Sequence, residues 1–192
     1  SWAGAKVLHP RSAELIEKYG LNVFLGNINS PEQATSIEVA EGYEASHLIT
    51  AIAHGKNVAQ FIVPRGDDKS QARLATIFAT VMHAGISMDM FTVTDRFAAF
   101  TVDLEQAPSA ERQLTGKGYS PSIKSPCQKV SIVGAGMHGL IGVMSRFTTA
   151  LTEAGIKILQ TVDSHATISA LVPSHMAKQA QQVLHKEFIS DD

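Results

Sequence analysis

Apolar and polar residues follow the same order twice along this chain. In the second copy, between Lys129 and Val172, a short apolar run precedes a glycine loop. After the loop, apolar residues recur at three- and four-residue steps, which places them on one face of a helix. Gly155 suits the left-handed residue that follows a helix. Two further apolar runs, 156–162 and 167–172, predict strands.

The first copy lies between Gln60 and Val102, at an offset of 70 residues from Gly85 to Gly155. The apolar positions that match at this offset are Ile77 with Phe147, Val81 with Leu151, Met88 with Ile158 and Val102 with Val172. Each copy predicts a strand, a loop, a helix and two strands, and a second helix follows. Two such units predict an α+β fold with antiparallel sheet on one side and helices on the other.

The remaining elements are predicted from the same periodicities and from turn residues. Helices are expected over 12–19, 70–82, 109–114 and 174–188, and strands over 21–28, 47–53, 59–64, 87–92 and 96–102. The polar stretch 29–44 is interpreted as a linker, and residues 54–57 as a turn between two strands. The stretch 115–126 is rich in Gly, Ser and Pro, and the boundary between the two units is placed there.

Composition excludes several classes of function. The net charge is −2, only 18% of the residues are charged, and no basic stripe is present, which argues against a nucleic-acid partner. The single cysteine rules out an internal disulfide framework and fits a reducing cytoplasm. No apolar run approaches the roughly twenty residues that cross a membrane, so no membrane partner is expected.

The glycine loop of the second copy invites a nucleotide-binding interpretation. Gly134, Gly136 and Gly139 form G-x-G-x-x-G after a strand, and Asp163 closes the next strand. Two observations argue against a dinucleotide site. Too few strands follow for a doubly wound sheet, and the matching loop, 64–69, has one glycine. A module that occurs twice without sharing this fingerprint does not share dinucleotide binding.

Other catalytic chemistry is not supported by the spacing of the residues. The eight histidines show no metal-ligand spacing, so no metal site is expected. Asp163, Ser164 and His165 are neighbours in one turn and cannot relay protons as a triad. Loops at helix starts suit a carboxylate, and the acids Asp67, Asp68, Asp89 and Asp163 suit an ammonium. Together they predict an amino-acid site; alternatively, these aspartates only cap helices and solvate turns.

Several blocks of sequence resemble a known family. GAKVLHPRS (4–12), LITAIAHGKNVAQFIV (48–63), KVSIVGAGM (129–137) and the ending 168–188 are similar, in the same order, to the carboxy-terminal half of aspartate kinases. DSHATISALV is most similar to the Bacillus-type isozyme that responds to diaminopimelate. The resemblance implies that the full enzyme phosphorylates L-aspartate with ATP and Mg²⁺. The kinase motif is absent here, so this chain is expected to hold no cofactor, to have no catalytic residue and to be inactive alone.

The resemblance also implies a domain organisation. Residues 1–44 correspond to the tail of the kinase domain and a linker, 45–126 to a first ACT domain and 127–192 to a second. ACT domains are ferredoxin-like βαββαβ folds that bind amino-acid end products, and one of the two is inserted into the other. The strand 48–53 is therefore expected to join the sheet of the second domain. Expected partners are the catalytic domain, a second copy of the chain through the ACT domains, and an effector.

The family's effector-contacting loops fall on four segments of this chain. The implied effector-binding residues are Arg65, Gly66, Asp67, Asp68, Lys69, Ser87, Met88, Asp89, Met90 and Phe91 in the first unit, and Met137, His138, Gly139, Leu140, Ile141, Gly142, Asp163, Ser164 and His165 in the second. Many relatives carry S-H-P-G at 139–142 and Pro-Gly near Ser70, where this chain differs. The effector's identity, diaminopimelate, lysine or threonine, is left open, and a ligand-free dimerisation scaffold is the alternative.

Overall fold

The structure, a computed structural model, describes residues 12, 15–16, 19–27, 30–37, 49–66, 71–134, 141–164 and 166–189. The chain divides into two compact units, 1–48 and 49–192. In the first unit, residues 12, 15, 16 and 19, which belong to the predicted helix 12–19, are helical. No helix in the described part of the chain is long and apolar enough to cross a membrane.

The first unit contains an antiparallel hairpin that was predicted only in part. Strand β1 (Val23–Asn27) confirms the strand expected over 21–28, but β2 (Ser30–Ile37) lies in the stretch interpreted as a linker. That interpretation was wrong for residues 30–37. Backbone pairing does not require apolar side chains, and a two-stranded hairpin tolerates polar residues. The strands approach closely at Gly26, where an added Cβ would lie 2.8 Å from the Cβ of Ala34.

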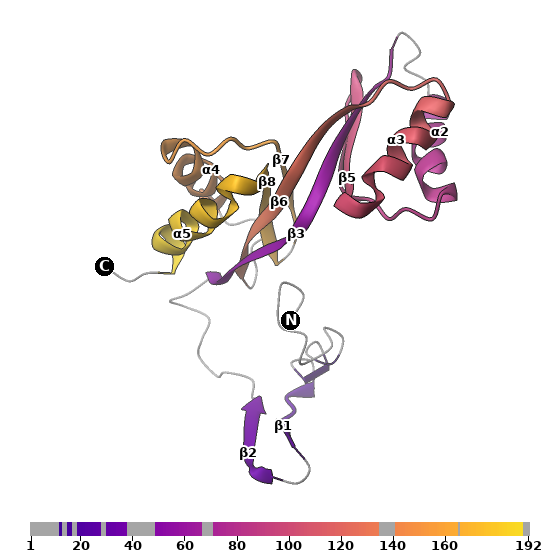
Figure 1. Ribbon diagram of the computed structural model, residues 1–192. Coiled ribbons are helices and arrows are strands. Elements are labelled where there is room, and N and C mark those ends of the chain that lie inside the picture. Colours follow the sequence, from indigo (N-terminus) through magenta and orange to yellow (C-terminus); the bar gives the residue numbers. More distant parts are fainter. Residues whose placement is uncertain are drawn as a thin grey trace. The chain divides into compact units, whose positions relative to one another are not determined.

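The second unit is built on one antiparallel sheet of six strands in the order β4-β5-β3-β6-β8-β7 (Figure 1). The strands are β3 (Ile49–Pro64), β4 (Asp89–Val93), β5 (Phe97–Asp103), β6 (Ser122–Gly134), β7 (Gln160–Asp163) and β8 (Thr167–Pro173). The helices are α2 (Gln71–His83), α3 (Ala107–Gly116), α4 (Val143–Glu153) and α5 (Ala177–Phe188), with 3-10 turns η1 (Leu104–Gln106) and η2 (Ser174–Met176).

Strand β3 corrects two of the predictions. The runs 47–53 and 59–64 do not form separate strands around a turn at 54–57, because β3 continues from Ile49 to Pro64. It pairs with β5 and β6, and a register shift between His54 and Asn57 absorbs the irregular residues without ending the strand. Strand β6 likewise begins at Ser122, inside the stretch predicted as a connection. Pairing with distant segments thus keeps these turn-forming residues within strands.

The two long strands divide the sheet into two halves, each covered by two helices (Figure 1). In the first half, α2 and α3 pack on β4, β5 and the end of β3, around Phe61, Phe100 and Ile77. In the second, α4 and α5 pack on β6, β8 and the start of β3, around Ile132, Phe147 and Leu151. Each half has four strands, because β3 and β6 contribute to both halves, and its two helices lie on one face. This arrangement confirms the ferredoxin-like α+β prediction.

The predicted repeat is visible in the packing and in the backbone. Strands β5 and β8 share one burial pattern, with five consecutive buried residues between two partly buried ones. Gly85 and Gly155 have φ values of +71° and +70° after equivalent helices, as left-handed C-cap residues do. Because β3 and β6 contribute to both halves, the residue boundaries of the two domains stay a prediction.

Candidate functional site

The first predicted loop is attached to the β4–β5 hairpin. Arg65 is 3% exposed, and its Nη1 donates to the carbonyl oxygen of Thr94 at 2.9 Å. Its backbone N–H donates to the carbonyl oxygen of Arg96 at 2.9 Å, and Gly66 follows with φ +63°. Arg65 therefore stabilises this hairpin. The predicted residues Asp67, Asp68 and Lys69 lie outside the described residues.

The second segment predicted in the first half of the sheet, 87–91, lies elsewhere. Asp89 pairs with Thr101 at the start of β4, whereas Arg65 contacts the hairpin at the other end of that strand. The register separates the two positions by four to five residues, or roughly 15 Å along the sheet. The sequence interpretation placed Asp89 and the loops at helix starts in one site. The structure does not bring Asp89 to the loop at Arg65.

In the second half of the sheet, the end of β6 and the β7–β8 hairpin lie at the same end of the sheet. The N–H of Gly134, the last residue of β6, donates to the carbonyl oxygen of Ala166, and this N–H is thereby engaged in the fold. Asp163 ends β7, and the Ser164 and Thr167 hydroxyls lie 2.9 Å apart in the following hairpin. Ile141 is exposed just before α4, and Gly142 there has φ +86°. Met137, His138, Gly139, Leu140 and His165 lie outside the described residues.

A hollow of about 360 Å³ is present beside the start of β4. Its lining residues are Gly55, Lys56, Val58, Ser87, Met88, Asp89, Met90, Thr101, Val102, Asp103 and Lys129. Four of them, at 87–90, were predicted as effector contacts. Phe91, the fifth residue of that predicted segment, is 68% exposed and makes an edge contact with Phe78.

Two ion pairs give this hollow its chemistry. Lys129 Nζ lies 2.5 Å from Asp89 Oδ2, and Lys56 Nζ lies 2.6 Å from Asp103 Oδ2. The lysines offer donors to a carboxylate and the aspartates offer acceptors to an ammonium. Sequence reasoning missed Lys56, Asp103 and Lys129. Lys56 stood in a predicted turn and Lys129 opened a strand, so no local pattern linked either to Asp89.

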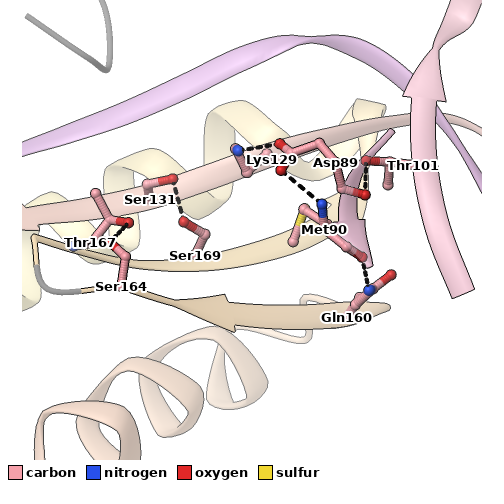
Figure 2. Close-up of polar contacts among 9 residues, drawn as sticks. All are labelled: Asp89, Met90, Thr101, Lys129, Ser131, Gln160, Ser164, Thr167 and Ser169. Atoms are coloured by element: carbon pink, nitrogen blue, oxygen red, sulfur yellow. Dashed lines mark hydrogen bonds and ion pairs between the residues drawn. The ribbon is translucent and has the colours of Figure 1, made fainter. Parts of the chain in front are cut away.

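The backbone at Met90 determines where Asp89 points (Figure 2). Met90 has φ +46°, a conformation that costs a non-glycine residue about 1–2 kcal/mol. A register shift between Asp89 and Thr92 marks a bulge here, and the Met90 N–H donates to Asp89 Oδ1 at 2.8 Å. The Met90 side chain is buried against Cys127 and Leu171, and this burial offsets the strained backbone.

Electrostatics in the hollow favour the ionised form of Asp89. Partial burial acts to raise the pKa of Asp89, but the hydrogen bonds from Lys129 and the Met90 N–H, together with the lysine's charge, lower this pKa below its usual value. Burial raises the pKa of the nearby Cys127 thiol, despite opposing contributions from Gln60 and Lys124. The thiol is therefore protonated at neutral pH and is not a nucleophile.

Replacing Lys129 by methionine is expected to raise the pKa of Asp89. A lowered pKa adds stability above the unfolded value near 4, and this stability is lost as the pH falls through the folded value. In Lys129→Met, the free energy of unfolding at pH 7 should fall by about 0.2–1 kcal/mol, and its acid dependence should flatten. Urea unfolding between pH 2 and 7 measures both effects, with Lys124→Met as the control. An unchanged pH dependence would contradict the contact.

A second hollow, of about 510 Å³, lies between α2 and α3. None of the predicted site residues lines it. Thr76 and Lys117 line it at positions that correspond, 70 residues on, to Arg146 and Glu187, which bridge α4 and α5 at 2.7 Å. The hollow thus reflects a difference in helix packing between the two halves. Among the described residues, no group of three or more His, Cys, Asp and Glu side chains is arranged to hold a metal ion.

Comparisons with known proteins agree on one relationship. Residues 122–186 match the family model described as ACT domain. The chain is 35% identical to aspartokinase 1 of Bacillus subtilis over 193 residues, which covers 98% of this chain and 48% of that protein. It therefore spans about half the length of this relative.

Solved structures show the same relationship. The regulatory subunit of aspartate kinase from Thermus flavus superposes with a TM-score of 0.67 and 26% identity, over 73% of this chain and 99% of that one. Aspartate kinase from Clostridium acetobutylicum superposes with a TM-score of 0.78 over 97% of this chain and 46% of that one. At 19% identity, the latter likeness shows the fold alone.

Proposed function

Because the chain belongs to the aspartokinase family, as a relative of its regulatory region, we propose that it senses an amino acid for such an enzyme. The complete enzyme would transfer a phosphoryl group from ATP, with Mg²⁺, to the side-chain carboxylate of L-aspartate and form 4-phospho-L-aspartate. That chemistry belongs to a catalytic domain, so the 192-residue chain is inactive alone. Its place of action is the cytoplasm, and it works as a homodimer joined through its ACT domains.

The observation that carries this proposal is the paired charge in the hollow beside β4. An amino acid needs donors for its carboxylate and acceptors for its ammonium. Lys129 offers the donors and Asp89 the acceptors, and Lys129 Nζ lies 2.5 Å from Asp89 Oδ2. Lys56 with Asp103 offers a second such pair in the same hollow. Diaminopimelate has two amino-acid ends, whereas lysine and threonine each have one. Two ion pairs therefore favour diaminopimelate as the effector.

Binding in this hollow would act on the kinase through the arrangement of the subunits. An effector stabilises the arrangement that it binds better, and this arrangement disfavours the active kinase. The coupling is reciprocal, so a substrate of the kinase weakens effector binding by the same factor. A typical coupling free energy is about 1–3 kcal/mol.

Titration calorimetry of the chain with meso-diaminopimelate, lysine and threonine tests the proposal. We expect saturable heat from diaminopimelate and weaker binding of the other two. Pimelate lacks the two ammonium groups and cadaverine lacks the carboxylates, so neither control should bind. If no amino acid gave heat, or if pimelate bound as well as diaminopimelate, the hollow would not be an amino-acid sensor.

A dimerisation scaffold without a ligand is the second candidate function. The observation that favours it is the apolar surface of the edge strand β4, where Phe91 is 68% and Val93 41% exposed. Such side chains suit a contact with another copy of the chain. A scaffold would sediment as a dimer with or without diaminopimelate, and Asp89→Ala or Asp163→Ala would change nothing. A sensor would show a ligand response that Asp89→Ala removes.

A further inference from the structure

We propose that Gln160, in the second half of the sheet, is a positioning residue for the hollow in the first half. It holds the Met90 backbone in its left-handed conformation and thereby aims the Asp89 carboxylate. The importance of this for binding rests on the proposed function, but its effect on Asp89 does not. Gln160 is also outside every segment that the sequence singled out as effector-contacting.

The contacts of Gln160 join strands from opposite edges of the sheet (Figure 2). Gln160 begins β7, and its Nε2 donates to the carbonyl oxygen of Met90 and, at 2.9 Å, to Thr92 Oγ1. Both acceptors lie on β4. On its other side, Gln160 Oε1 accepts a hydrogen bond of 3.0 Å from Nε2 of Gln60 on β3. One side chain therefore ties β7 to both β4 and β3.

An amide is the side chain that this position requires. It supplies two N–H donors for the β4 acceptors and one oxygen for Gln60. Gln60 is 2% exposed, and within the described part of the chain its Oε1 has no hydrogen-bond partner. Its Nε2 contact with Gln160 therefore carries much of its hydrogen bonding, and loss of Gln160 would leave a buried polar group poorly paired.

Met90 needs an external contact because its own strand does not hold it. The bulge between Asp89 and Thr92 removes Met90 from regular pairing with β5, and its φ of +46° is disfavoured for a side chain with a Cβ. The Gln160 amide engages the Met90 carbonyl, and the Met90 N–H engages Asp89 Oδ1 at 2.8 Å. If Met90 relaxed to an extended conformation, its carbonyl oxygen would leave Gln160 and its side chain would leave the buried cluster. The Asp89–Met90 peptide, whose N–H contacts the carboxylate, would then no longer be held in place.

The internal repeat explains why this arrangement occurs on one side. At the offset of 70 residues, Gln160 corresponds to Met90 itself, and the counterpart of Asp89 is Leu159. The two halves thus meet at equivalent positions, with the carboxylate in the first half and the amide in the second. A movement of β7 would shift the position of Asp89 through Gln160. The conformation of the second half therefore affects the hollow.

The test uses the whole chain with Gln160→Met, which keeps the size of the side chain and removes the amide. Three quantities are measured. They are the pKa of the Asp89 carboxyl by NMR titration, the exchange rate of the Met90 amide hydrogen, and the affinity for diaminopimelate. Charged groups lining the same hollow are Lys129, Lys56 and Asp103. We expect the pKa of Asp89 to rise, exchange at Met90 to quicken about tenfold, and affinity to fall about fivefold.

The matched control is Gln179→Met, which removes an amide that donates to the carbonyl oxygen of Ala154 at 3.2 Å, at the surface of the second half. It should leave Asp89 unchanged. If Gln160→Met fails to fold, Gln160→Asn keeps the amide but is too short to reach Met90, and the same shifts are expected. Lower stability with an unchanged Asp89 titration would overturn the inference and leave Gln160 a structural residue. A wild-type chain that binds no diaminopimelate refutes the proposed function alone, because the Asp89 titration still decides this inference.

Discussion

Replacing Asp89 by lysine is expected to weaken the binding of diaminopimelate by about tenfold to a hundredfold. The substitution removes the carboxylate that would accept the ligand's ammonium. It also places a second ammonium opposite Lys129, whose Nζ lies 2.5 Å from Asp89 Oδ2 in the wild-type chain. The like charges repel each other and any cationic ligand group. Titration calorimetry at low and high salt measures the loss. The difference between the variant and the wild type should shrink at high salt.

Asp95→Lys is the matched control for this substitution. Asp95 is exposed in the β4–β5 hairpin, so the same change of charge is made in the same half of the sheet but away from the hollow. Its affinity should equal that of the wild type. Equal losses in both variants would indicate a general effect of charge, and wild-type affinity in Asp89→Lys would remove Asp89 from the binding site.

Leu171→Ala is expected to lower the free energy of unfolding by about 2–5 kcal/mol. Leu171 is fully buried on β8, in a small cluster with Met90 and Cys127 where the two halves of the sheet meet. The substitution leaves a cavity beneath Met90, so the contact that offsets its left-handed backbone is weakened. Urea unfolding measures the loss of stability. Amide exchange should also quicken at Met90, in the other half of the sheet.

Leu184→Ala separates stability from communication between the halves. Leu184 is fully buried in the core formed by α4, α5 and β6, away from the cluster at Met90. We expect a similar loss of stability, again about 2–5 kcal/mol. Exchange at Met90, corrected for global unfolding, should not change. If the two variants affected Met90 equally, the cluster around Leu171 would not be the link between the halves.

Helices and strands with a strong local period could be predicted from the sequence. Helix α2 occupies 71–83 where 70–82 was expected, and strands β4 and β5 form the expected hairpin. The errors occurred where pairing outweighed local composition. His54-Gly55-Lys56 is typical of a turn, yet it lies inside β3 because β6 pairs with the strand at His54 and again at Asn57.

The candidate site could be predicted only in part. The segment 87–90 lines the hollow, but its charged partners come from strands that the sequence did not connect with it. Lys129 is 40 residues from Asp89, and Gln160 is 70 residues from Met90. The left-handed conformation of Met90 also has no local signal, because methionine does not favour it.

The sequence by itself determined the repeated module, its α+β class and the faces that each helix and strand buries. These properties follow from the spacing of apolar residues along short segments, where chain neighbours decide the structure. Only the tertiary structure decided that β3 and β6 run through both halves, that Lys129 meets Asp89 and that Gln160 reaches Met90. Those contacts depend on how strands twist and pair across the sheet. The packing of segments that are distant in the sequence cannot be predicted from the periodicity of apolar residues within one segment.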